Sequence, residues 1–75
     1  MAAIEVRLFA TFRQGRFDKR VMDLPKGTRL REVVRDLAIP EEDISLPLVN
    51  GRYVALDREL ESHDVVSLFP AVGGG

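Results

Sequence analysis

The group with the clearest chemical potential in this sequence is the α-carboxyl of its last residue, which follows the run Gly73, Gly74 and Gly75. Residues without side chains form a thin and flexible arm. Such an arm can enter a crevice too narrow for any residue that carries a Cβ atom. We therefore expect the carboxyl carbon of Gly75 to react and Gly73 and Gly74 to give it reach. The alternative is a frayed chain end or a remnant of an expression vector.

Other groups offer little chemistry. The sequence contains no Cys, which excludes disulfides, thiolate nucleophiles and zinc sites with sulfur ligands. His63 is the only His, and we expect it to serve a surface turn. The acidic segment 41–43 is expected to be a solvated turn, because three adjacent carboxylates do not converge on one cation unaided. We predict no metal site and no catalysis by the chain itself.

Size and composition describe a small globular protein. The chain has 75 residues, 45% of them hydrophobic, with a net charge of −1. A chain of this length forms one domain, close to the smallest size at which a hydrophobic core is stable without further support. Its charges form no basic stripe for nucleic acid, no apolar run approaches the roughly 18 residues of a membrane span, and the first residues lack a signal-peptide pattern. We expect a cytoplasmic protein that binds neither nucleic acid nor membrane.

Alternating apolar residues and turn signals predict a set of strands. They cover residues 4–9, 19–24, 46–49, 52–54 and 65–70. The pair Asn50-Gly51 favours a type I′ turn between the third and fourth strands. Tyr53, directly after this turn, is expected to pack across the hairpin. Phe12 and Phe17 are expected to pin the loop over residues 11–18.

One helix is predicted between the second and third strands. Leu30, Val33, Val34 and Leu37 form a single apolar stripe at helical spacing. We expect Thr28 as its N-cap, and an end before Pro40, because the residue that precedes a proline avoids the helical region. One helix that covers one sheet face makes a two-layer α+β domain. If the first and last strands pair, the sheet is mixed and the fold is a β-grasp.

Two aromatic residues are predicted on the face of the sheet that the helix does not cover. Alternation places Phe9 opposite Ile4, Val6 and Leu8. Phe69 faces outward in the same way if Val66 and Leu68 face the helix. The two rings would then form an apolar patch at the root of the tail, of the kind that binds partners. The alternative is that one or both rings fold under the loop 11–18 and complete a side core.

Residues spread over the whole chain resemble the MoaD/ThiS family of ubiquitin-like sulfur carriers. They are Asn50, Gly51, Leu60, Asp64, Val66 and the run 69–75, and the segment 6–10 resembles the first strand of the molybdopterin synthase small subunit. Gly74 and Gly75 match the terminal diglycine. The chain departs from the pattern at His63, where many members have Gly before Asp, and at Ala71, where a second Pro is frequent.

The resemblance implies a fold and a mechanism. The fold is an α+β β-grasp (ubiquitin-like) domain over residues 1–70, with a mixed sheet of four to five strands packed on one main helix, followed by a flexible tail over residues 71–75. An E1-like adenylating enzyme would use ATP and magnesium to activate Gly75. Sulfide would then displace AMP and leave a thiocarboxylate. Gly73 and Gly74 would thread into the partner, and Phe9, Phe69, Pro70 and Val72 would contact it.

Several functions remain open within this resemblance. Phe69-Pro70 and Phe9-Ala10 favour molybdopterin biosynthesis, in which the acceptor is the large subunit of molybdopterin synthase. The alternatives are a sulfur carrier for thiamine thiazole, with a thiazole synthase as acceptor, or for another sulfur-containing product. A ubiquitin-like modifier of lysines needs the same tail, and a plain interaction module does not need the glycines. In each case we expect a carrier or binding protein, monomeric when free, that binds no cofactor itself.

Overall fold

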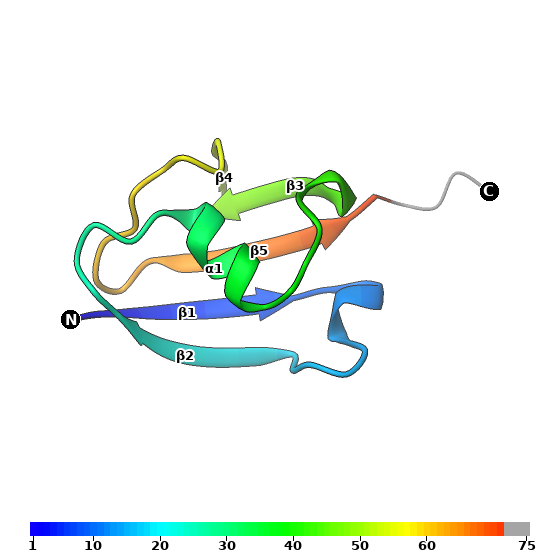
Figure 1. Ribbon diagram of the computed structural model, residues 1–75, viewed down its shortest axis with the longest axis horizontal. Helices are drawn as coiled ribbons and strands as arrows, with labels where there is room; N and C mark the ends of the chain where they lie inside the picture. The colour runs from blue at the N-terminus through cyan, green and yellow to red at the C-terminus, as the bar shows by residue number, and fades with distance from the viewer. Residues whose placement is uncertain (72–75) are drawn as a thin grey trace.

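The computed structural model describes residues 1–71 and contains the predicted set of elements (Figure 1). In chain order they are β1 (Ala2–Leu8), η1 (Ala10–Arg13), β2 (Lys19–Leu24), α1 (Leu30–Asp36), η2 (Glu41–Asp43), β3 (Ile44–Val49), β4 (Arg52–Tyr53) and β5 (Val65–Pro70). The second and last strands have the predicted bounds. β1 ends at Leu8, so Phe9, predicted as its last residue, lies just outside it. β3 begins two residues earlier than predicted, and β4 is one residue shorter than predicted. Short 3-10 turns, η1 and η2, occupy segments that were predicted as irregular.

The strands form one mixed sheet in the order β2-β1-β5-β3-β4. The two central strands, β1 and β5, are parallel, with Val6 beside Val66 and Leu8 beside Leu68. Every other neighbouring pair in the sheet is antiparallel. Since the first and last strands pair and one helix crosses over them, the predicted β-grasp fold is confirmed.

Helix α1 covers one face of this sheet, and the core lies between them (Figure 1). The predicted inward residues of the central strands are fully buried: Ile4, Val6, Leu8, Val66 and Leu68. Leu30, Val33 and Val34 of the helix are fully buried against them, whereas Leu37 is partly buried at the edge of the cluster. The apolar stripe and the strand alternation therefore predicted the core correctly.

The start of the helix corrects one prediction. Arg29 occupies the N-cap position, with extended backbone, and its N–H donates to the Glu32 carboxylate at 2.8 Å. The Thr28 hydroxyl instead donates to the carbonyl of Pro25 at 2.6 Å. A carboxylate three residues into a helix satisfies the N-cap N–H from the side chain. Thr28 therefore stabilises the preceding turn and is not the N-cap.

The helix also ends earlier than Pro40 requires. Ala38 adopts a left-handed conformation with φ of 57°. Its N–H donates to the Arg35 carbonyl at 2.9 Å, and the N–H of Ile39 donates to the Val34 carbonyl at 3.1 Å. This pair of bonds is a Schellman motif, which stops a helix and usually has Gly at the left-handed position.

The hairpin between β3 and β4 has the predicted turn and leaves the ring of Tyr53 exposed. Asn50 and Gly51 have φ values of 54° and 81°, as a type I′ turn requires. Tyr53 pairs with Leu48 across the hairpin, as predicted, but its side chain is 69% exposed. It lies opposite Leu48 on the face of the sheet away from α1. No second layer covers that face within the described residues, and β4 is too short to bring further side chains over the ring.

Candidate functional site

The sheet face opposite α1, called here the open face, is rich in apolar side chains. Strand register places on it Val21, Leu46, Leu48, Tyr53, Val65 and Phe69. Leu46 is 39% exposed and Val21 is 63% exposed. Glu5 and Arg7 of β1 lie on the same face and separate Val21 from the apolar residues of β5, β3 and β4. Apolar residues gathered on the surface of a small protein often mark a site that binds another macromolecule.

Two aromatic rings stack on the open face where β5 ends. Phe9 and Phe69 have ring centroids 4.1 Å apart and planes inclined by 12°. Both rings are half-buried. The guanidinium of Arg13 lies 5.5 Å from the centre of the Phe9 ring, and its Nε donates to the Leu8 carbonyl at 2.9 Å. The structure therefore brings the two predicted patch residues together, with one cation at the rim.

The loop over residues 11–18 uses other rings for its own packing. Phe12 is 5% exposed and belongs to the core, and Phe17 packs against its edge, as predicted. Arg16 joins this loop to the end of α1, because its guanidinium donates to the carbonyls of Leu37 at 2.9 Å and Ala38 at 3.2 Å. The side core under the loop is thus built from Phe12 and Phe17, and Phe9 stacks on Phe69 instead.

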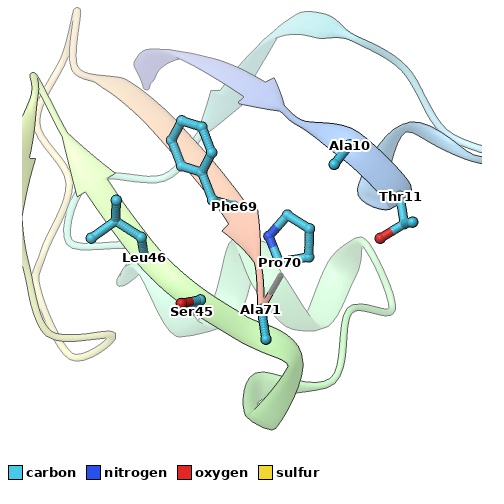
Figure 2. A pocket seen from close by; sticks show the side chains of 7 residues that line it. All are labelled: Ala10, Thr11, Ser45, Leu46, Phe69, Pro70 and Ala71. Atoms are coloured by element: carbon cyan, nitrogen blue, oxygen red, sulfur yellow. The ribbon is translucent and has the colours of Figure 1, made fainter. Parts of the chain in front are cut away.

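An apolar groove of about 420 Å³ lies beside this aromatic pair (Figure 2). Its lining residues come from η1, from the start of β3 and from the end of β5: Ala10, Thr11, Ser45, Leu46, Phe69, Pro70 and Ala71. Two hydroxyls, from Thr11 and Ser45, are the polar side-chain groups in this lining. A shallow apolar depression with few polar groups suits an inserted side chain of a partner better than a charged small molecule.

The last described residues are held by the sheet up to the groove. Pro70 pairs with Ile44, and the N–H of Ala71 donates to the carbonyl of Asp43 at 3.0 Å. A register shift between Ile44 and Leu46 leaves Ser45 without a partner on β5. Val72 and the three glycines, Gly73, Gly74 and Gly75, lie outside the described residues. β5 therefore delivers the chain to the rim of the groove at a fixed point.

A buried polar clamp, missed by the sequence analysis, fixes the other end of β5. Asp64 is 5% exposed, and its carboxylate accepts from Asn50 Nδ2 at 2.9 Å and from the Glu61 N–H at 2.8 Å. Asn50 Oδ1 in turn accepts from the Val65 N–H at 2.9 Å. Both side chains are among the residues that carried the family resemblance, which was the one available signal. We call this arrangement the Asn50–Asp64 clamp.

His63 sits directly before the clamp and has a backbone role. Its φ is 74°, and its N–H donates to the Ala3 carbonyl at 2.8 Å. The residue thus takes the left-handed conformation that Gly would take more easily. Its exposed side chain belongs to a turn at the start of β5, at the opposite end of that strand from the groove.

Charged residues around α1 pair with one another and stabilise the fold. The Arg31 guanidinium bonds to Asp57 and, at 3.0 Å, to Glu41. The hydrogen bond to Asp57 raises the pKa of Arg31 above its ordinary value. Within residues 1–71, no group of three or more His, Asp or Glu side chains is placed to hold a metal ion. No helix in that part of the chain is long and apolar enough to cross a membrane.

Comparison with known proteins identifies relatives of similar size. The model of the ThiS family matches residues 6–75. A putative molybdopterin converting factor subunit 1 from Pyrococcus furiosus is 35% identical, with a TM-score of 0.80 over 96% of this chain and 100% of that one. A comparison with curated proteins gave no match.

More distant structures share the fold. Small archaeal modifier protein 1 from Haloferax volcanii is 21% identical, with a TM-score of 0.79 over 96% of this chain and 100% of that chain. A chain in the complex of subunits 1 and 2 of the molybdopterin-converting factor from Helicobacter pylori is 22% identical, with a TM-score of 0.66 over 97% of this chain and 99% of that chain.

Proposed function

Because this chain belongs to the ThiS family, we propose that it is a sulfur carrier that bears sulfur as a thiocarboxylate on Gly75. The observation that carries this proposal is the family match, which extends through the three terminal glycines to residue 75. The groove and the aromatic pair support it, because they lie where β5 delivers the chain toward that end.

The proposed chemistry follows from the weakness of a carboxylate as an acylating agent. Oxide is too poor a leaving group, so an adenylating partner first joins the Gly75 carboxylate to AMP from ATP and releases pyrophosphate. Sulfide then attacks the carbonyl carbon, the bond between this carbon and the phosphate oxygen breaks, AMP leaves, and Gly75 bears a thiocarboxylate. After an acceptor takes the sulfur and water supplies an oxygen, Gly75 is again a carboxylate. ATP and magnesium belong to the partner in this scheme.

In this scheme the chain docks on its partner and extends its last residues into the partner's active site. From Ala71 to Gly75 an extended chain spans at most roughly 14 Å. This length suffices to cross the wall of a partner's active site when the open face and the groove are docked outside it. Phe9, Phe69 and Pro70 would then contact the partner's surface, Val72 would lie at the entrance, and Gly73 and Gly74 would fill the narrow passage.

We favour molybdopterin biosynthesis as the pathway, with this chain as the small subunit of molybdopterin synthase. The relative that supports it is the 35% identical P. furiosus protein, described as a molybdopterin converting factor subunit 1. The acceptor would be a large catalytic subunit, and the H. pylori complex of subunits 1 and 2 of the molybdopterin-converting factor supports a partner subunit of this kind. The name of the matching family keeps a thiazole carrier as the second candidate. The likeness to a small archaeal modifier keeps conjugation to lysines as the third.

A substitution at the last glycine tests the threading step. Gly75→Val is expected to reduce ATP-dependent adenylation by a matching E1-like enzyme at least about 100-fold, since a branched side chain blocks the passage. Ala55→Val adds a comparable volume at an exposed site away from the groove and should keep normal adenylation. Both variants should retain the wild-type melting temperature. Normal adenylation of Gly75→Val would contradict the proposal.

A further inference from the structure

The free edge of the sheet offers a surface unrelated to the groove. Strand β2 is the last strand on its side and pairs only with β1 among the described strands. In Figure 1 it runs along the lower margin of the molecule, and no described element passes beyond it. An edge strand of six residues presents a row of backbone groups that can pair with another strand.

The direction of these backbone groups follows from the pairing with β1. The Leu8 N–H donates to the Asp18 carbonyl at 2.9 Å, so residues 8 and 18 form a hydrogen-bonded pair. Hydrogen-bonded and non-hydrogen-bonded pairs alternate along an antiparallel ladder. The backbone groups of Lys19, Val21 and Asp23 therefore point away from β1, toward the free edge.

The side chains of the same three residues lie on the open face. Their partners on β1 are Arg7, Glu5 and Ala3, which alternate with the buried residues of that strand. Lys19, Val21 and Asp23 are all exposed, and Val21 is 63% exposed. The edge thus presents a cation, an apolar residue and an anion, in this order and on one face.

We propose that β2 pairs antiparallel with β2 of a second copy of this chain, about a two-fold axis that passes through Val21 perpendicular to the sheet. Val21 then lies opposite Val21 of the second copy, and Lys19 lies opposite Asp23 twice by symmetry. All three are hydrogen-bonded pairs, which gives up to six backbone bonds across the edge. The two sheets become one continuous sheet, with both open faces on the same side.

Alternative registers fit less well. A shift by one residue brings open-face side chains opposite helix-face side chains, which the pleat does not allow. A shift by two in one direction places Arg20 opposite Arg20, and like charges directly opposite are destabilising. A shift by two in the other direction leaves Asp23 opposite Val21 and Lys19 opposite Pro25, which has no N–H to donate. The register about Val21 alone pairs both charges.

Charged residues often protect an edge strand from pairing. Here the charges have opposite signs and stand at equal distances from the centre, so they favour self-pairing in one register. Two short strands bury far less than the roughly 1,200–2,000 Å² of a stable interface, so the dimer is weak. With a contact this weak, the expectation of a monomer applies to dilute solution only.

The dimer leaves the groove free. A two-fold axis perpendicular to the sheet reverses the strand direction, so the two β5 strands end on opposite sides of the dimer. In the sheet order Phe69 lies on β5, two strands away from the new contact, and Phe9 follows the end of β1, the strand between them. Self-association is therefore independent of the proposed sulfur chemistry. A result that contradicts one of the two proposals leaves the other unaffected.

Charge reversal at two exposed positions tests the register. In sedimentation equilibrium up to about 1 mM protein, the wild type is expected to dimerise with a dissociation constant of roughly 10 μM to 1 mM. Lys19→Asp and Asp23→Lys each place like charges opposite each other twice, and each should raise that constant at least about tenfold. An equimolar mixture of the two variants regains both ion pairs and should associate within about threefold of wild type, as should the double variant.

Circular dichroism and melting temperature control for folding, since both positions are exposed. A wild type that remains monomeric at about 1 mM would overturn the proposal. Single variants that associate as well as wild type would also overturn it, as would a mixture that associates no better than its components.

Discussion

Replacement of Asn50 is expected to destabilise the fold more than its position in an exposed turn suggests. Asn50→Ala removes the bond from Nδ2 to the Asp64 carboxylate and the bond from the Val65 N–H to Oδ1, both 2.9 Å long. A bond to a charged group contributes about 1.5–3 kcal/mol, and a neutral one about 0.5–1.5 kcal/mol. Because the second bond is exposed, the expected loss from both is about 2 kcal/mol.

Backbone conformation adds to this loss and can be separated from it. Asn50 has a φ of 54°, where a residue with a Cβ and no local hydrogen bond pays a further cost of about 1 kcal/mol. Asn50→Gly removes the side-chain bonds but adopts that φ easily. We therefore expect a loss of about 2 kcal/mol for Asn50→Gly and about 3 kcal/mol for Asn50→Ala.

Urea unfolding followed by far-ultraviolet circular dichroism measures these losses, since the chain has no Trp. The midpoint should fall and the slope should stay constant if the folded state is otherwise intact. Gln14→Ala, at an exposed polar residue, is the matched control and should stay within about 0.5 kcal/mol of wild type. If both Asn50 variants also stay within about 0.5 kcal/mol, the Asn50–Asp64 clamp does not hold β5 as described.

Three further predictions use the same unfolding assay. Ala38→Gly should raise the free energy of unfolding by about 0.5–1 kcal/mol, because Gly relieves the left-handed strain in the Schellman motif; a decrease would contradict this. Arg16→Ala should lower it by about 1–2 kcal/mol through the lost bonds to the Leu37 and Ala38 carbonyls, whereas Arg16→Lys should recover less than half. Phe69→Ser should lower it by about 2 kcal/mol and weaken binding to the adenylating or acceptor partner at least about tenfold in titration calorimetry; unchanged affinity would remove the groove from the interface.

The sequence predicted the parts of the fold that depend on burial of one face. Alternation in β1 and β5 and the stripe in α1 each place a whole set of side chains against one core. The period alone therefore determines which residues face inward. It also predicted that Phe9 and Phe69 would be neighbours, because two parallel central strands in register place outward residues side by side.

Capping was less predictable because several polar groups compete for each terminus. Thr28 has a typical N-cap side chain, but Glu32 satisfies the N–H of Arg29 and moves the start by one residue. Glu three residues after Arg29 was the signal for this. The end at Ala38 had no such signal, since Ala rarely adopts a left-handed conformation, and bonds from Arg16, distant in sequence, hold it there.

Tertiary polar contacts could not be derived from periodicity. The Asn50–Asp64 clamp joins residues from two turns and depends on the register of β3 and β5. The groove likewise combines η1, β3 and β5, and its shape depends on the register shift after Ile44. The exposure of Tyr53 likewise could not be derived from its place after the turn, because it follows from the shortness of β4.

Intact mass spectrometry tests the proposed function most directly. The chain would be incubated with an E1-like adenylating enzyme, ATP, magnesium and a sulfur donor, and then analysed together with its C-terminal peptide. The expected product has one oxygen replaced by sulfur, located on the peptide that ends in Gly75, and it should be absent without ATP and in Gly75→Val. A chain that keeps an unmodified carboxylate with an enzyme shown to act on another carrier, or that acquires only lysine adducts, would contradict the sulfur-carrier function.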